Sequence, residues 1–179
     1  MKHILYTLAV VFVISFSAKA QSENYHTFKV DLALGYAQPS GNGVKGGASL
    51  SLEPKYNIND QVAIGLKFES SWLSTVTDTR NDYYSGAAVG SYLLTGEYYF
   101  LESLARPFLG AGVGFYNQSS VTVIGGSATS ATIGGTSFGF APKGGFQIGH
   151  FRLVGEYNLV KDLNFFTIKA GITFGGGRK

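Results

Sequence analysis

The stretch TFKVDLALGYA, residues 27–37, alternates between apolar side chains and polar or small ones. A β-strand sends successive side chains to opposite faces, so this period of two predicts an amphipathic strand. Lys29 and Asp31 fall on one face of that strand. The opposite face carries Phe28, Val30, Leu32, Leu34 and Tyr36.

The same alternation recurs seven times further along the chain. The eight predicted strands are residues 27–37, 44–56, 61–74, 87–100, 107–117, 137–148, 151–159 and 164–174. The pattern is weakest in the fourth, where Val89, Leu93 and Tyr99 fall on the polar side. Pro54 and Pro142 interrupt two other strands. Proline cannot donate to a ladder, so we expect a bulge or a strand end at each.

The charged residues of these strands all lie opposite the apolar face. A basic side chain facing lipid at mid-depth costs about 2–4 kcal/mol, which is a reason to keep one face free of charge. Buried charges persist when they are paired, so we predict a lumen filled by ion-paired side chains. The predicted lumen charge network comprises Lys29, Asp31, Lys45, Glu53, Lys55, Lys67, Glu69, Glu97, Lys143, Arg152, Glu156 and Lys169.

The strand lengths fit a lipid bilayer. Strands of about 11 residues, at ~3.3 Å each and tilted by ~40°, rise roughly 28 Å, against an apolar band of ~25 Å. Aromatic side chains gather near both ends of the outward faces, as two interfacial girdles would. One rim has Tyr36, Trp72, Tyr92, Phe115, Phe138, Tyr157 and Phe166, and the other has Phe28, Tyr56, Phe100, Phe151 and Phe174.

Strands can span lipid only as a closed barrel, because every backbone polar group must then be satisfied within the protein. We therefore predict an all-β fold, an eight-stranded antiparallel up-and-down transmembrane β-barrel. Gly110, Gly112 and Gly114 would all point inward and relieve crowding in so narrow a barrel.

The beginning of the chain has the pattern of a secretory signal peptide. Lys2 and His3 precede the mostly apolar run 4–16, and Ala18-Lys19-Ala20 is a small-x-small cleavage site. The apolar run is shorter than the ~20 residues that a spanning helix needs. We expect residues 1–20 to be a cleaved signal peptide and residues 21–179 to form one outer-membrane barrel domain.

Composition excludes several classes of function. The chain has no cysteine, which excludes disulfides, thiolate chemistry and a lipoprotein anchor. Without residues 1–20, 12 basic residues face 11 acidic ones, so no nucleic-acid partner is predicted. Gly41-x-Gly43-x-x-Gly46 matches a dinucleotide fingerprint but precedes a strand rather than a helix. His26 and His150 have no second ligand nearby in sequence, so we predict no cofactor, metal or catalytic residue.

The connections between strands alternate in length. Residues 57–60, 101–106 and 149–150 make short turns, whereas 38–43, 75–86 and 118–136 are longer. The short link 160–163 breaks this trend. Short turns are periplasmic and longer loops extracellular in such barrels. Loops 75–86 and 118–136 are therefore where an extracellular ligand would bind, although plain solvated loops fit equally, and 118–136 could be a hairpin that extends the strands.

Several motifs give the chain a family resemblance. They are Tyr98-Tyr99-Phe100, the run Arg106–Phe115, Gly155-Glu156-Tyr157 and the ending Ile168–Phe174. With them the chain resembles the small outer-membrane β-barrel domain family, the OmpA-like and OmpX-like barrels. The resemblance implies an outer-membrane location in contact with lipid. Some members are lipid-modifying enzymes acting from the outer leaflet, where no histidine is predicted here, so we expect no enzymatic activity.

Three functions compete. The first is a structural or surface-interaction barrel with a filled lumen, supported by the paired inward charges and the long loops. The second is a narrow channel for ions or small molecules. The third is a soluble lipocalin-like carrier with polar residues outside, which periodicity alone allows but which the aromatic rims and inward glycines disfavour.

Overall fold

A computed structural model describes residues 24–40, 44–78, 83–124, 127–161 and 163–176. The predicted signal peptide, residues 1–20, lies outside the described residues. No helix in the described part is long and apolar enough to cross a membrane. The strands are β1 (Phe28–Pro39), β2 (Val44–Lys45), β3 (Gly47–Asn57), β4 (Val62–Asp78), β5 (Tyr83–Tyr99), β6 (Ala105–Ile124), β7 (Ser127–Ile148), β8 (Phe151–Val160) and β9 (Phe165–Gly175).

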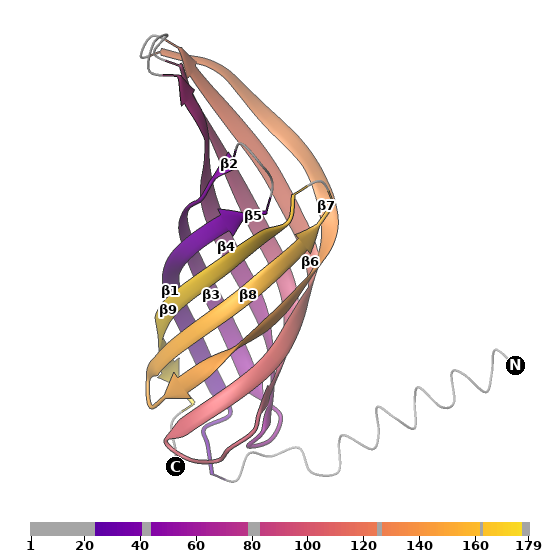
Figure 1. The fold of residues 1–179 in the computed structure, drawn as a ribbon. Helices are drawn as coiled ribbons and strands as arrows, with labels where there is room; N and C mark the ends of the chain where they lie inside the picture. Colours follow the sequence, from indigo (N-terminus) through magenta and orange to yellow (C-terminus); the bar gives the residue numbers. More distant parts are fainter. Residues whose placement is uncertain (1–23, 41–43, 79–82, 125–126, 162, 177–179) are drawn as a thin grey trace, which may run out of the picture.

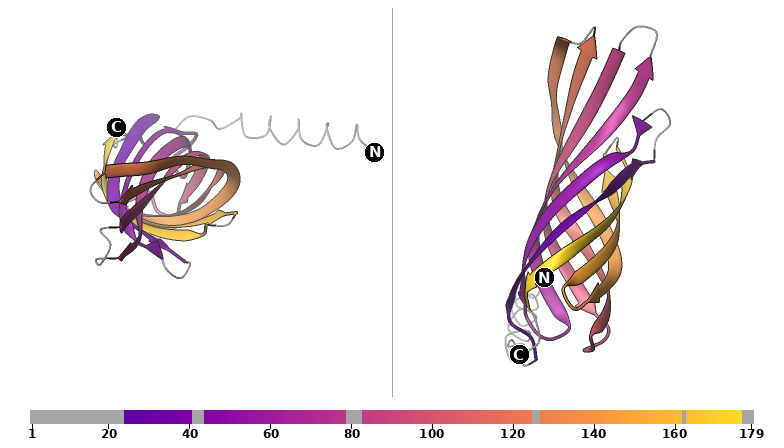
Figure 2. Two further views of the ribbon diagram at one scale, coloured as in Figure 1. Left: turned by 90° about the horizontal axis from the view of Figure 1, so that it is seen from above. Right: turned by 90° about the vertical axis from the view of Figure 1, so that its left-hand side faces the viewer.

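The strands form one closed antiparallel barrel (Figure 1). The nine labelled strands form an eight-stranded barrel, because β2 is a two-residue segment that directly precedes β3 and pairs with the same neighbour, β4. Each of the eight barrel strands pairs with the next one in sequence. The first, β1, also pairs with the last, β9, from Lys29↔Gly175 to Pro39↔Phe165, and this pairing closes the barrel. Figure 2 shows the ring from above. The predicted all-β, eight-stranded antiparallel barrel is confirmed.

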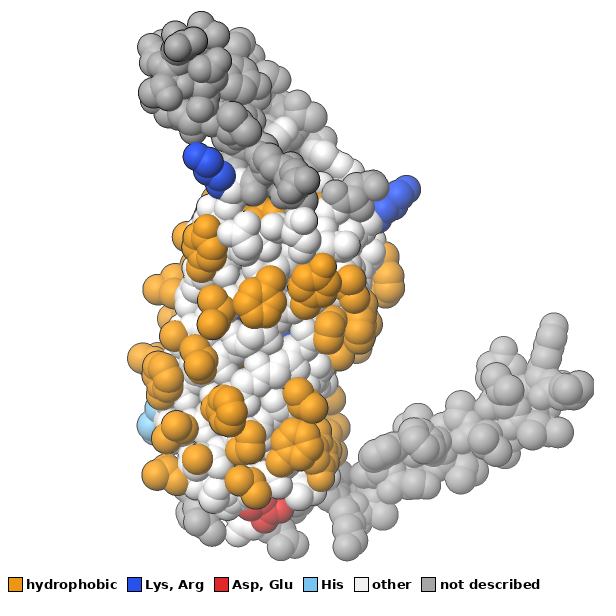
Figure 3. Space-filling model, viewed as in Figure 1, with side chains coloured by type: hydrophobic (Ala, Val, Ile, Leu, Met, Phe, Trp, Pro, Cys, Tyr) orange, Lys and Arg blue, Asp and Glu red, His pale blue; other side chains and the backbone are white. Residues whose placement is uncertain are grey.

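The alternation in sequence becomes an inside and an outside. Phe28 is 60% exposed and Leu34 65%, whereas Lys29 between them is 1% exposed. Apolar side chains cover the wall facing the viewer in Figure 3, and the prominent charged side chains of that face lie near its two ends. Soluble monomers rarely expose apolar patches of this extent. The carrier hypothesis is wrong, because it requires an apolar interior and a polar exterior.

Aromatic side chains form rows along the wall where the register aligns them. Tyr92 is the Cα partner of Phe115, which is in turn the partner of Phe138 on β7. The rings of Phe115 and Phe138 meet edge to face at 5.7 Å between centroids. On the opposite rim Phe28 pairs with Tyr56. These exposed rows fit the interfacial aromatic belts of membrane barrels.

The two ends of the barrel differ. Residues 24–27 and 175–176 lie at one end, the terminal end, together with the short turns 58–61, 100–104 and 149–150. At the opposite, hairpin end, the β4–β5 and β6–β7 hairpins rise beyond the other strands (Figure 2). We call residues 75–78, 83–86, 118–124 and 127–136 the hairpin extension. Residues 75–78 and 83–86, expected in a loop, thus belong to β4 and β5, while residues 79–82 of that expected loop lie outside the described residues. In the segment 118–136, residues 118–124 and 127–136 match the hairpin alternative.

The two strand prolines produce neither of the effects that were expected. Pro54 stays in register with Val30 of β1, and Pro142 with Ala111 of β6. On the opposite edge of each strand, the β3–β4 pairing resumes at Lys55↔Gly65 after Leu52↔Phe68. The β7–β8 pairing likewise resumes at Lys143↔Glu156 after Phe140↔Leu159, and neither gap changes the register. The expectation of a bulge or strand end was therefore wrong. Each strand continues because proline removes one donor, and so disturbs one edge only.

Candidate functional site

The lumen gathers the charged side chains into two ion clusters. We name each after its central carboxylate. The Glu97 cluster consists of Asp31, Glu53, Lys55, Glu97, Lys143 and Arg152. The Glu69 cluster consists of Lys67, Glu69, Glu156 and Lys169. Among the described residues, no ion pair joins one cluster to the other.

Glu97 of β5 accepts from cations on three other strands. Its Oε1 lies 2.6 Å from the Lys55 ammonium, 2.7 Å from that of Lys143 and 2.5 Å from Arg152 Nη2. The hydroxyl of Tyr99 donates to Glu97 Oε2 over 2.8 Å. These contacts join β5 to β3, β7 and β8 within the lumen and balance the charge of Glu97.

Two further carboxylates complete the Glu97 cluster. Asp31 lies 2.6 Å from the Lys55 ammonium and accepts from the Thr173 hydroxyl at 2.6 Å. Glu53 lies 2.6 Å from the Lys143 ammonium and accepts from the Thr95 hydroxyl at 2.6 Å. Three cations thus face three carboxylates. The cluster is neutral overall, which limits the desolvation cost of burying it.

The Glu69 cluster is the smaller of the two and is also neutral. Lys67 lies 2.9 Å from Glu69 and pairs with Glu156 across the lumen. Lys169 of β9 pairs with Glu69 and lies 3.7 Å from Glu156. The hydroxyl of Ser49 donates to Glu69 over 3.0 Å. Each of these carboxylates is paired with a cation, so the cluster links the three strands β4, β8 and β9.

An apolar layer lies in the lumen towards the hairpin end. Tyr116 and Phe165 meet edge to face at 6.3 Å between centroids, and the Tyr116 hydroxyl donates to Asn158 Oδ1 over 2.8 Å. Val89 and Leu93, which weakened the alternation of the fourth predicted strand, belong to this layer. Its buried members are Ala37, Leu73, Val89, Leu93, Tyr116, Ala141, Val160 and Phe165. A second, smaller apolar group near the terminal end comprises Ala63, Tyr99, Phe108 and Val154.

Most residues of the predicted lumen charge network point into the lumen. The eleven that are buried are Lys29, Asp31, Glu53, Lys55, Lys67, Glu69, Glu97, Lys143, Arg152, Glu156 and Lys169. Lys29 is in no ion pair of the described residues. Instead its ammonium donates to the Tyr99 hydroxyl over 2.8 Å and lies 4.4 Å from the centre of that ring.

Lys45 is the exception, because its side chain is exposed. Its assignment to the lumen was wrong for a reason of register. β3 pairs with β4 as Ser49↔Ser71, but β2 pairs as Lys45↔Ser74, one residue out of step. A one-residue slip sends every later side chain to the other face.

Sequence reasoning missed two buried polar groups. Arg106 was assigned to a turn, but β6 begins at Ala105 and turns the Arg106 side chain inward. Alternation places Tyr99 on the inward face but indicates no role for it, whereas its hydroxyl contacts Lys29, Glu97 and Arg152. The run of three aromatics could not show this role, since Tyr98 and Phe100 on either side of Tyr99 face outward.

The other motifs have structural surroundings. His26 is exposed, and His150 Nδ1 lies 2.8 Å from the Thr173 carbonyl oxygen. No group of three metal-ligating side chains occurs among the described residues. Gly46 is followed by strand β3, and Gly41 and Gly43 lie outside the described residues. A Cβ on Gly110 would lie 3.0 Å from Glu97 Cγ, so this inward glycine makes room for the Glu97 cluster.

Known proteins resemble the chain in structure. No protein-family model matches the sequence, and no curated protein matches it. The structure of Neisserial surface protein A is similar over 86% of this chain and 99% of that one, with a TM-score of 0.56 and 20% identity. The structure of Ail, the attachment invasion locus protein of Yersinia pestis, in complex with the heparin analogue sucrose octasulfate, is similar with a TM-score of 0.56 and 15% identity. The similarity covers 83% of this chain and 100% of that one. The structure of the outer membrane protein OprG of Pseudomonas aeruginosa has a TM-score of 0.51 and 14% identity, over 86% of this chain and 98% of that one.

These likenesses agree with the architecture. At such identities they show the fold, and the fold is that of small outer-membrane β-barrels. The apolar exterior and the charged, ion-paired interior are properties of this chain itself. Together they define the protein as an eight-stranded outer-membrane barrel with an ion-paired lumen.

Proposed function

We propose that the protein is an outer-membrane barrel with a closed lumen that acts through the surface of its hairpin end, and that it is neither a pore nor an enzyme. The observation that carries the proposal is the set of ion-paired and apolar side chains buried in the lumen. Two neutral ion clusters join strands within it, and an apolar layer lies above them. An eight-stranded barrel has an interior just wide enough for its side chains to fill.

The hairpin extension is the part of the molecule best placed to meet a partner. Short turns characterise the periplasmic end of such barrels, so the hairpin end faces outward. Its longer hairpin belongs to a stretch, residues 107–142, that contains no charged side chain and is rich in Gly, Ser and Thr. Such a surface suits hydrogen bonding to an uncharged glycan or to a protein backbone.

A polysulfated ligand fits this chain poorly. The Ail structure contains the heparin analogue sucrose octasulfate. Binding such an anion requires clustered cations. Here the connections at the hairpin end carry no net positive charge, because Lys45, Arg80 and Lys161 are matched in number by Asp78, Asp82 and Asp162. We therefore expect this protein to discriminate against polyanions, and sucrose octasulfate serves as a negative probe.

Trimming the longer hairpin tests the surface role. Asn117 and Thr136 are Cα partners, and the Thr136 hydroxyl donates to Asn117 Oδ1 over 2.7 Å. Residues 118–135 can therefore be replaced by an Asn-Gly turn at this pair. Cells displaying the trimmed barrel should lose attachment to immobilised proteins and glycans that bind the full chain. Glu102→Gln, at the terminal end, is the control. Attachment that survives trimming of both hairpins would contradict the role.

Planar bilayer recording tests the closed lumen, with the channel as the competing function. The purified protein should show no discrete conductance steps. Steps that change in Lys67→Gln or Glu69→Gln would mean that ions pass the Glu69 cluster, and the channel would replace the closed barrel.

A further inference from the structure

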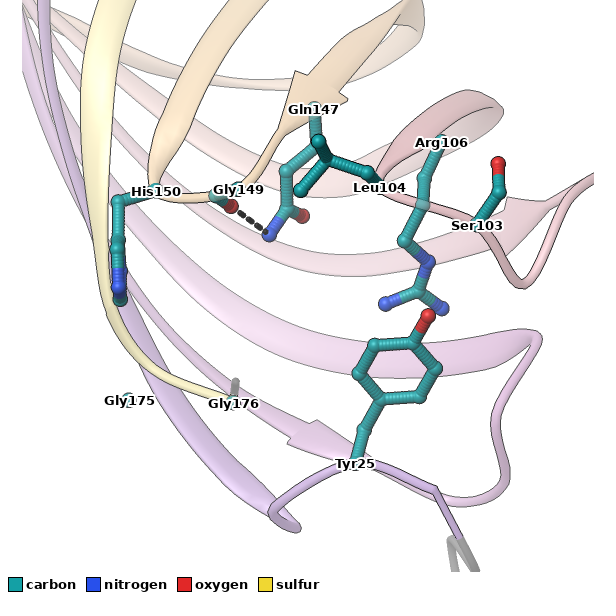
Figure 4. Close-up of a pocket in the computed structure, with 9 residues that line it drawn as sticks. All are labelled: Tyr25, Ser103, Leu104, Arg106, Gln147, Gly149, His150, Gly175 and Gly176. Carbon is teal, nitrogen blue, oxygen red and sulfur yellow. Dashed lines mark hydrogen bonds between the residues drawn. The ribbon is translucent and has the colours of Figure 1, made fainter. Parts of the chain in front are cut away.

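A pocket opens at the terminal end, remote from the hairpin extension. Its volume is about 210 Å³, and Figure 4 shows its lining side chains. Arg106 enters it from β6 and Gln147 from β7, while Tyr25 and Leu104 form apolar walls. A water molecule occupies about 30 Å³ of liquid, so the pocket exceeds what a single water would fill.

Arg106 presents a cation to this pocket. Its guanidinium lies between two aromatic rings, 3.9 Å from the centre of Tyr25 and 4.2 Å from that of Tyr99. Its Nε donates to the Leu101 carbonyl over 3.4 Å and its Nη2 to that of Asp60. None of the ion pairs among the described residues includes Arg106, although it is 4% exposed. The charge is held in place by neutral groups.

Gln147 presents an acceptor beside that cation. It is the Cα partner of Arg106 across the β6–β7 ladder and is 5% exposed. Its Nε2 donates to the Gly149 carbonyl over 3.1 Å, which fixes the amide. Its Oε1 is buried and has no hydrogen-bond partner in the described chain. Such a group is costly to leave unpaired, and it therefore indicates a donor that occupies the pocket.

We propose that this pocket binds the C-terminal carboxylate of a short peptide. The carboxylate pairs with the Arg106 guanidinium, and the adjacent amide N–H donates to Gln147 Oε1. Cation and acceptor stand on neighbouring strands in direct register, so one terminal residue reaches both. The side chain of that residue packs on Tyr25 and Leu104. Capture of a chain terminus by a few polar groups is a recurrent mode of peptide recognition.

A set of three small probes separates the two contacts. N-acetylglycine carries the carboxylate and the neighbouring N–H, acetate carries the carboxylate alone, and N-acetylglycinamide carries the N–H without the charge. The ¹⁵N-labelled protein, purified from membranes and held in lipid nanodiscs, is titrated with each. N-acetylglycine should shift the Arg106 Nε–H and Gln147 Nε2–H signals saturably. Acetate should bind more weakly, and the amide should not bind.

Three variants make the assignment specific. Arg106→Gln should weaken N-acetylglycine at least about tenfold, as the loss of a charge-assisted hydrogen bond does. Gln147→Leu should retain acetate binding and lose the preference for N-acetylglycine. Lys45→Gln removes an exposed cation at the hairpin end, and it should bind like the unmodified protein.

Several outcomes would overturn the proposal. One is the absence of saturable shifts, which means that water alone fills the pocket. Another is equal affinity in Arg106→Gln and the unmodified protein. A third is binding that appears only after residues 177–179 are removed, since the chain itself would then occupy the pocket next to Gly176. If Arg106→Gln does not fold, loss of the preference in Gln147→Leu still decides.

Discussion

Replacing Glu97 by glutamine removes the central negative charge of the Glu97 cluster. Lys55, Lys143 and Arg152 would then face only Asp31 and Glu53, which leaves one buried positive charge without compensation. Three charge-assisted contacts of 2.5–2.7 Å are weakened. Breaking a buried ion network in this way costs about 3–5 kcal/mol. The larger sum of three separate hydrogen bonds is not expected, because each cation keeps another partner.

Urea unfolding in lipid vesicles measures this loss. Trp72 is the single tryptophan and faces outward, so its fluorescence reports departure from the bilayer. Glu102→Gln, in an exposed turn, should change the free energy of unfolding by no more than about 0.5 kcal/mol. Adding Lys143→Gln to Glu97→Gln restores neutrality and should recover about 1–3 kcal/mol relative to the sum of the single changes. A Glu97→Gln protein as stable as the unmodified one would refute the reasoning.

Three further substitutions, each with a matched control, test other parts of the barrel by the same unfolding measurement. Tyr99→Phe removes a hydroxyl that contacts Lys29, Glu97 and Arg152, so it should lower the free energy of unfolding by about 1–3 kcal/mol. Its control, Tyr98→Phe on the outer wall, should lower it little, and equal losses would contradict the role of Tyr99. Gly110→Ala places a Cβ against the Gly96 carbonyl and Glu97, so it should lower the free energy of unfolding by about 1–3 kcal/mol. Its control is Gly96→Ala, because a Cβ there meets no atom within 4 Å. If Gly110→Ala leaves the stability unchanged, the lumen is loosely packed. Leu34→Arg on the lipid-facing wall should cost about 2–4 kcal/mol, and Leu104→Arg in a turn at the terminal end about 0–1 kcal/mol; a reversed order would place the membrane elsewhere on the barrel.

The sequence predicted the barrel because lipid outside and a charged lumen inside impose the same alternation of apolar and polar side chains on every strand. Residues 27–37 show that rule clearly, and the faces of Phe28 and Lys29 follow from it. The hairpin extension obeys no such rule. Its Gly, Ser and Thr side chains carry little hydrophobic contrast, so the strands of β6 and β7 continued where loops were expected.

The composition of the lumen was more predictable than its connections. That Glu97 and Lys143 point inward follows from alternation, but their contact depends on which strands face each other across the barrel. The slip between β2 and β3 could not be read from local sequence, so Lys45 was placed on the wrong side. Arg106 was missed because strand boundaries are the least certain part of such a prediction. Val89 and Leu93 looked like defects in a strand and are part of the apolar layer.

Outer-membrane fractionation, followed by gel electrophoresis of unheated and boiled samples, tests the central claim most directly. A closed barrel with an apolar wall and an ion-paired interior should fractionate with the outer membrane and change its mobility only after boiling. A soluble protein with the same mobility before and after boiling would contradict the account, because its apolar wall could not then face lipid.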